Sequence, residues 1–226
     1  MSFRPATLSD QLYRELKRRI LHCELPPGSR LIEKSLCEQL QVSRTSLREA
    51  LNRLSGERLV SLKTNCGFSV APLTEESFHN ICELRRVLES QAAALAAKRA
   101  TPQDIEDIRA AATVVCELDD PDGHRIYCEV NRAFHASVAA AIDNLLLEEA
   151  ILSALDKDQQ PIYYGIDLGM CTSPAEVSAE HNAIVDAIEA RDANLARMLM
   201  WDHIGAKEDR ILEALRASAK AELAGV

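Results

Sequence analysis

The sequence predicts a mostly α-helical protein in two parts that meet near residue 72. Hydrophobic residues make up 47% of the 226 residues and aromatic residues only 4%. Alanine and leucine dominate the apolar set, which favours helices over sandwiches or barrels. The charge also divides here: residues 1–72 carry 12 Lys and Arg against 7 Asp and Glu, whereas residues 73–226 carry 14 against 28. A basic segment on an acidic body indicates that the first part meets a polyanion.

The first part begins with two helices separated by a turn. Leucine and isoleucine recur on one face between Ser9 and about His22, which predicts a helix over that range. The paired prolines and the glycine of "LPPGSRL" (25–31) end this helix in a turn. A short helix follows near Glu33–Leu40.

A third helix and a hairpin complete this part. Ser43 is a suitable N-cap for a helix that runs to about Leu54. The apolar segments "LVSLK" and "FSVA" then flank Thr64–Gly67, as the strands of a small hairpin would. Helix, helix, turn, helix and hairpin is the order of a winged helix-turn-helix, which we assign to residues 1–72.

The second part, residues 73–226, shows a series of helix starts. Each is a capping residue or a turn followed by helix-forming sequence, namely Thr74, "TPQD" (101–104), Pro-Asp-Gly (121–123), "SPAE" (173–176) and Asp192. About six helices fit between residues 74 and 220. The fold class predicted here is an all-α antiparallel helix bundle.

Composition excludes several classes of protein. No stretch approaches about 18 uninterrupted apolar residues, which a membrane-spanning helix needs. The opening "MSFRPATLSDQLYREL" lacks the apolar core of a secretory signal, so we expect a cytoplasmic protein without a membrane partner. The seven cysteines are scattered without a C-x-x-C pair, which argues against a disulfide framework or a zinc ribbon.

The third helix presents a face suited to DNA. Arg44 and Arg48 are four residues apart on one side, beside the hydroxyls of Thr45 and Ser46 and the capping Ser43. Arginine forks match guanine edges and phosphates, and hydroxyl groups suit phosphate oxygens. The alternative is an ordinary solvated helix face. The short helix before it, the basic local charge and the hairpin favour the DNA-binding interpretation.

Three histidines in the acidic part predict a metal site. Asn131 and His135 are four apart on one helix face, and His181 and His203 each lie 11 residues from Asp192. If Asp192 marks the turn of a helix hairpin, those two imidazoles come level with one another. Three imidazoles and one oxygen suit zinc, nickel or another first-row divalent ion. The alternative is that each is a surface or core histidine, as we assume for His22, His79 and His124.

The segment "EKSLCEQLQVSRTSLREALNRLSGERLVSLKTNCGFSV" resembles the DNA-binding domain of the GntR family of bacterial transcription regulators. The resemblance implies DNA contacts at Lys34, Arg44 and Arg48, and a wing tip at Asn65 to Gly67. Many relatives have arginine between that Asn and Gly, where this chain has Cys66. It also implies a homodimer, acting as a repressor, that binds a short inverted-repeat operator with one recognition helix per half-site.

Residues 74–220 are similar to the FadR C-terminal ligand-binding domain in its metal-binding variety. The resemblance rests on "ELRRVLESQAAALAA" (83–97), "NRAFH" (131–135), "EH" (180–181) and His203, and the shortness of the domain places it closer to the vanillate-regulator-like group. It implies one divalent ion per chain on Asn131, His135, His181 and His203, where the family more often has Asp at the first position.

The same resemblance implies a small organic acid as effector, bound at the metal. Arg85 matches a position that often faces the pocket, where a guanidinium can hold a carboxylate through two hydrogen bonds. The alternative is a surface ion pair of Arg85 with Glu89, four residues further on.

Two other functions remain open at this stage. Three histidines on an open metal are able to activate water, as in a metal-dependent hydrolase. We predict that the protein is not an enzyme, because no Glu or Asp accompanies the histidines in a general-base spacing such as H-E-x-x-H. A regulator whose metal is purely structural, without an effector, is the second alternative.

Overall fold

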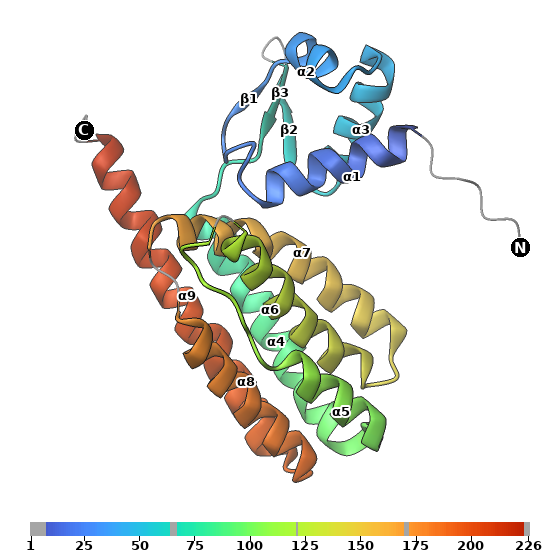
Figure 1. Ribbon diagram of the computed structural model, residues 1–226, viewed down its shortest axis with the longest axis vertical. Helices are drawn as coiled ribbons and strands as arrows, with labels where there is room; N and C mark the ends of the chain where they lie inside the picture. The colour runs from blue at the N-terminus through green and yellow to red at the C-terminus, as the bar shows by residue number, and fades with distance from the viewer. Residues whose placement is uncertain (1–7, 64–66, 121, 170–171, 224–226) are drawn as a thin grey trace, which may run out of the picture. The chain divides into compact units, whose positions relative to one another are not determined.

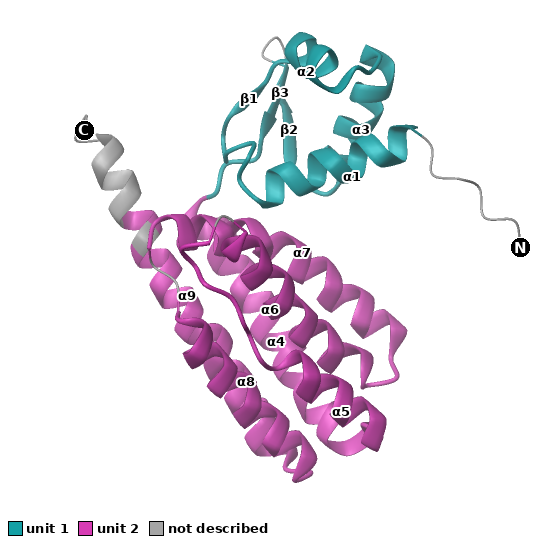
Figure 2. Cartoon of the chain, viewed as in Figure 1, with its two compact units in different colours: residues 1–73 teal, residues 74–226 magenta. Residues whose placement is uncertain are grey.

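The structure is a computed structural model that describes residues 8–63, 67–120, 122–169 and 172–223. It divides into two compact units, residues 1–73 and 74–226 (Figure 2). The predicted fold class is confirmed, because a small helical unit with a three-stranded sheet precedes an all-helical unit.

Three helices and three short strands make up the described part of the first unit. Its elements are α1 (Leu8–Leu21), β1 (Arg30–Leu31), α2 (Glu33–Leu40), α3 (Arg44–Gly56), β2 (Val60–Lys63) and β3 (Gly67–Val70). The hairpin β2–β3 pairs antiparallel, with Val60 opposite Val70 and Lys63 opposite Gly67. The helices and hairpin therefore match the predicted winged helix-turn-helix.

Strand β1 was not predicted, because we read its residues as part of a turn. Arg30 pairs with Ser69 and Leu31 with Phe68, which makes β3 the central strand of the sheet. Gly28 precedes it with φ of 75°, a conformation that glycine adopts at no steric cost. A two-residue strand is too short to show a periodicity in the sequence, and only its long-range pairing defines it.

Leucine and isoleucine side chains hold this unit together. Leu16 and Ile20 of α1 face Leu47, Leu51 and Leu54 of α3 in one core, and none of the five is exposed. Their spacing of three and four residues on each helix places them on a single face. The opposite face of α3 is left to solvent.

The second unit is a bundle of six described helices (Figure 1). They are α4 (Glu75–Arg99), α5 (Pro102–Ala111), α6 (Gly123–Ala140), α7 (Leu145–Asp167), α8 (Pro174–Glu189) and α9 (Ala193–Leu223). Helices α4 and α9 lie antiparallel along their length, with alanines of α4 in the core between them. None of the described helices is both long and apolar enough to span a membrane.

The predicted helix starts are present in this unit. Thr74, Thr101 and Ser173 each form a capping box with the residue three positions later. The Asp192 carboxylate accepts the backbone N–H groups of Asn194 and Leu195, so it caps α9 as expected. Helix α6 begins at Gly123, whereas Pro121 lies outside the described residues. The caps at Ser173 and Asp192 fix where α8 and α9 begin. They therefore also fix the positions of His181 and His203 along these helices.

Candidate metal centre and nucleic-acid interface

A tight turn sets helix α3 against helix α2. Gln41 adopts the left-handed conformation (φ 53°) and ends α2, and two residues later Ser43 caps α3. The Ser43 Oγ accepts the Ser46 backbone N–H at 3.1 Å, as the sequence predicted. This cap satisfies one of the free N–H groups of the first turn and fixes where the exposed face of α3 begins.

The exposed face of α3 carries the predicted arginines. Arg44, Thr45 and Arg48 are exposed and line one surface groove with Glu49 and Asn52. A second groove, about 440 Å³ in volume, runs between α2, α3 and the wing strands. Arg48 and Asn52 line both grooves, which therefore meet on this face of the helix.

Glu33 holds the Arg48 guanidinium, a contact that the sequence did not predict. Arg48 Nε donates to Glu33 Oε2 at 2.7 Å, and Nη2 donates to Oε1 at 3.1 Å. The hydrogen bond from Arg48 lowers the pKa of Glu33, so the carboxylate stays charged. This pairing occupies the edge of the guanidinium formed by Nε and Nη2, and Nη1 takes no part in it.

The remaining predicted DNA-binding residues lie on the same unit. Lys34 is exposed in the first turn of α2, and Gly67 begins β3 with φ of 79°. Asn65 and Cys66 of the wing tip lie outside the described residues. Asn52, one turn beyond Arg48, is a further exposed polar residue on α3, and an asparagine amide is able to pair with adenine.

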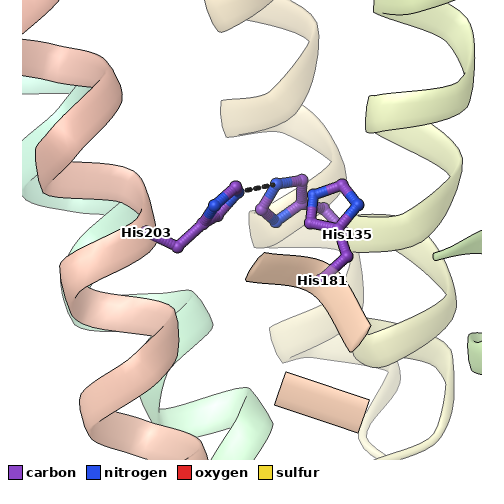
Figure 3. A group of neighbouring side chains, drawn as sticks. All are labelled: His135, His181 and His203. Atoms are coloured by element: carbon purple, nitrogen blue, oxygen red, sulfur yellow. Dashed lines mark hydrogen bonds between the residues drawn. The ribbon is translucent and has the colours of Figure 1, made fainter. Parts of the chain in front are cut away.

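Three histidines from three helices meet inside the second unit (Figure 3). His135 comes from α6, His181 from α8 and His203 from α9, and each side chain is buried. One ring nitrogen from each lies within 4.8 Å of the others. The ring centroids of His181 and His203 are 4.9 Å apart. This confirms the prediction that the two imidazoles lie opposite one another across the helix hairpin at Asp192.

An oxygen acceptor faces the Nδ1 atom of each ring. Glu89 Oε2 lies 2.5 Å from His135 Nδ1, although off the axis of a regular hydrogen bond. Glu180 Oε2 lies 2.6 Å from His203 Nδ1, and the Ala112 carbonyl oxygen lies 3.3 Å from His181 Nδ1. An oxygen acceptor favours the tautomer with hydrogen on Nδ1, which leaves the lone pair of each neutral ring on Nε2.

The Nε2 atoms of His135 and His203 face one another, and His181 lies beside them. His203 Nε2 lies 3.3 Å from His135 Nε2, and the buried His181 Nε2 has no hydrogen-bond partner among the described residues. Facing lone pairs repel one another unless a cation or a proton lies between them. Two nitrogens at about 2.0–2.1 Å from one tetrahedral zinc ion stand roughly 3.4 Å apart, so the observed spacing fits a shared cation.

The protonation state of the centre also suits a metal. Burial lowers the pKa of His135 to about 4, with Glu89 opposing the shift and Arg85 adding to it. Burial also lowers the pKa values of His181 and His203. The three rings are neutral at pH 7, so a metal ion displaces no proton when it binds.

Asn131, the fourth predicted ligand, is buried one turn before His135 on α6.

Arg85, the predicted effector residue, is buried rather than exposed. Its Nε donates to Glu89 Oε1 at 2.5 Å, and its Nη1 donates to Asp158 on α7. Lys207 of α9 reaches the same Asp158 oxygen at 2.5 Å. The ion pair of Arg85 with Glu89 therefore exists, but it is buried next to His135 and is not the surface pair considered above.

The sequence did not predict the roles of four residues at this site. Glu89 and Glu180 orient His135 and His203, and Asp158 and Lys207 extend the charged network. In metal sites, a histidine that binds the ion through one ring nitrogen commonly donates its other ring N–H to a carboxylate. Glu89 lies four residues after Arg85, and Lys207 lies four residues after His203, so this spacing places each on the same helix face as its predecessor. No comparable signal in the sequence identifies Asp158.

Both units match known protein families. The family model described as "Bacterial regulatory proteins, gntR family" matches residues 8–70, and that described as "FCD domain" matches residues 80–206. The "Probable D-xylose utilization operon transcriptional repressor" of Paenarthrobacter nicotinovorans is 30% identical over 203 residues, which cover 88% of this chain and 87% of the relative.

Two further comparisons cover nearly the whole chain. The "Galactonate operon transcriptional repressor" of Escherichia coli (strain K12) is 24% identical over 225 residues, which cover 91% of this chain and 97% of the relative. The solved structure "E. coli McbR/YncC" superposes with a TM-score of 0.69 and 26% identity, over 92% of this chain and 99% of that one. Both of these curated relatives are named as transcriptional repressors. The chain belongs to the GntR family of bacterial regulatory proteins, in which an N-terminal DNA-binding domain is followed here by an FCD domain.

Proposed function

We propose that this regulator is a homodimeric repressor whose affinity for an inverted-repeat operator responds to a small organic acid. The acid binds at one divalent metal ion per chain, zinc or nickel, held by Asn131, His135, His181 and His203. The observation that carries the proposal is that three buried imidazole rings meet, with one ring nitrogen of each within 4.8 Å of the others. The bound metal would supply a Lewis-acid anchor for a carboxylate, since three imidazoles and an amide leave coordination positions open.

The DNA-reading part rests on α3. The face that carries Arg44, Thr45 and Arg48 is exposed, and Ser43 and Ser46 lie at its start, where free N–H groups suit phosphate. Lys34, Asn65 and Gly67 complete the proposed DNA-binding set. Repression as the direction of control is supported by relatives that are named as operon repressors.

The acid would act by binding one arrangement of the helical unit better than another. Only such a difference in affinity shifts a conformational equilibrium. Helix α4 follows the DNA-binding unit directly in the chain, and it carries both Arg85 and Glu89. Clamping of the acid by Arg85 stays a prediction, and it requires the acid to share the guanidinium with Glu89 and Asp158 or to replace one of them.

We propose that two copies dimerise through α4 and α9. Leu84 and Val87 of α4 and Met198 and Trp201 of α9 are large apolar side chains that are 43–55% exposed. The Arg86 guanidinium of α4 lies 5.5 Å from the Trp201 ring, so the two apolar stripes adjoin. Contiguous exposed apolar surface is typical of an interaction face.

Replacing Val87 by Glu should convert the dimer to a monomer, because it buries an unpaired charge in the apolar face of both copies. Sedimentation velocity of the full chain gives the measurement. The matched control is Leu146→Glu, since Leu146 is 78% exposed at the start of α7. A Val87→Glu protein that still sediments as a dimer would place the interface elsewhere.

Acid response should require metal. An operator is first selected from random duplexes with the full chain, and its affinity is then followed by fluorescence anisotropy against a panel of small organic acids. At least one acid should change operator affinity by about 5- to 150-fold in zinc-loaded protein, the usual range of coupling between two sites. The same acid should have no effect after chelation. An equal response in chelated protein would contradict the metal as anchor, and zinc-loaded protein that ignores every acid would favour a purely structural metal.

A further inference from the structure

We propose that His203 is the gate through which the metal ion enters and leaves the centre, and that Glu180 is the latch that holds this gate closed. In this device the His203 ring turns outward from α9, and Glu180 on α8 opposes the movement. The inference rests on the proposed function, because it concerns how the proposed ion reaches its ligands. It is carried by the groups that lie on the outer side of each imidazole ring.

The metal centre is closed to solvent. The side chain of His135 has no exposed surface, His181 is 0% exposed, and the side chain of His203 is 5% exposed. A metal ion therefore reaches the ring nitrogens only after part of the bundle has moved. Local movements of this kind occur in folded proteins at free energies that differ from place to place. The ion is expected to enter where the movement costs least.

The three rings differ in what lies behind them. Behind Nδ1 of His135 lies Glu89, whose side chain is itself only 2% exposed. Behind Nδ1 of His181 lies a backbone carbonyl oxygen. Behind Nδ1 of His203 lies Glu180, whose side chain is 37% exposed. His203 is therefore the ring that separates the centre from a solvent-exposed carboxylate, and it turns toward water with the least disturbance of the core.

The His203 ring extends from the surface of the bundle to its interior. On its outer side, Nδ1 lies 2.6 Å from Glu180 Oε2, and on its inner side, Nε2 lies 3.3 Å from His135 Nε2 (Figure 3). The ring belongs to α9 and the carboxylate to α8, so their hydrogen bond joins the two helices of the hairpin. An outward turn of the ring breaks this hydrogen bond and withdraws Nε2 from the centre in one movement.

The contacts of His203 oppose one another in the metal-free protein. When His203 and His135 both carry their hydrogen on Nδ1, two lone pairs face one another across the centre, which favours an outward turn of His203. The hydrogen bond to Glu180 favours the inward position. A hydrogen bond to a carboxylate is stronger than one between neutral groups, but water is able to replace it at a partly exposed side chain. The latch is therefore one that opens reversibly.

A latch changes rates without changing affinity. On this proposal the hydrogen bond to Glu180 is intact in the closed protein, with and without metal, and is broken only while the gate is open. Its loss therefore speeds binding and release by the same factor and leaves the Kd of the metal nearly unchanged. A carboxylate that only strengthens its histidine as a ligand behaves differently. Loss of such a carboxylate weakens the bound state, so it speeds release and raises the Kd.

The test follows cobalt(II) binding to the full chain by stopped-flow absorbance, and cobalt release by displacement with excess zinc. In wild-type protein the observed binding rate should rise with cobalt concentration and then level off, because opening of the gate becomes limiting. Glu180→Ala should raise both this plateau and the release rate about 3- to 10-fold, the usual effect of losing one hydrogen bond. Glu180→Gln retains an acceptor oxygen and should stay close to the wild-type rates.

The matched control is Glu189→Ala, which removes the same charge from the same helix at a residue that pairs with Arg109. It should leave both rates unchanged. A wild-type binding rate that rises linearly throughout would overturn the inference without any variant. So would a wild-type plateau in Glu180→Ala, faster release alone in that variant, or equal acceleration in Glu189→Ala. Protein that binds neither cobalt nor zinc would instead contradict the proposed function.

Discussion

Arg48→Ala should abolish operator-specific binding while the protein remains folded. Arg48 is exposed on α3, and its contact with Glu33 uses Nε and Nη2 but not Nη1. Loss of one bidentate base contact costs about 1–3 kcal/mol. A dimer that reads an inverted repeat loses the contact twice, so affinity should fall roughly 30-fold to more than 10,000-fold. Arg44→Ala should behave in the same way. Gel-shift titration against the selected operator gives the measurement.

Two controls separate base reading from general electrostatics. Arg18→Ala removes the same charge from α1 of the same unit, where Arg18 pairs with Glu15 and Glu24. It should change operator affinity only slightly. Lys34→Ala should weaken all DNA sequences alike and flatten the salt dependence, as the loss of a phosphate contact does. Wild-type operator affinity in both Arg44→Ala and Arg48→Ala would show that α3 does not read DNA.

His181→Ala should remove stoichiometric metal from the protein. His181 is fully buried on α8, its Nε2 has no hydrogen-bond partner among the described residues, and one of its ring nitrogens lies within 4.8 Å of a ring nitrogen of each of the other two histidines. Wild-type protein with free zinc at about 100 times its Kd gains about 2.7 kcal/mol of unfolding free energy. For a chain of this size that gain raises Tm by about 5–10 °C. In His181→Ala the shift on adding zinc should vanish, which differential scanning calorimetry detects.

The matched control is His124→Ala on α6. His124 lies 3.0 Å from Asp167 and does not belong to the three-histidine group. Its removal should leave both the metal content and the zinc-induced shift in Tm intact. Elemental analysis of protein purified without a His-tag or chelator completes the comparison. Wild-type protein that carries no metal, and that gains none on dialysis against zinc or nickel, would reduce the centre to three buried histidines.

Local signals explain what the sequence could predict. The caps at Ser43, Thr74 and Asp192 act on the residues next to them, so helix starts were readable from short segments. The level placement of His181 and His203 followed from equal distances to one turn. Strand β1, by contrast, exists only through its pairing with β3, which comes some forty residues later in the chain.

Burial of charge could not be predicted from local signals. The spacing of Arg85 and Glu89 identified a pair, but an exposed pair and a buried one have the same spacing. What places this pair in the interior is Asp158 on α7, which is 73 residues from Arg85 along the chain. The orientation of each histidine likewise depends on an oxygen from elsewhere in the chain, such as the carbonyl of Ala112 for His181.

The nitrogen character of the centre has a consequence for the cell that contains it. Magnesium and calcium are hard cations that prefer oxygen ligands, and magnesium gives up its water reluctantly. Three neighbouring imidazole rings are therefore poor ligands for them. The borderline ions zinc and nickel are favoured by the same atoms. On the proposed function, ordinary changes in the magnesium supply would leave this centre undisturbed, and the supply of the scarcer transition metals would determine how many copies are able to respond to an acid.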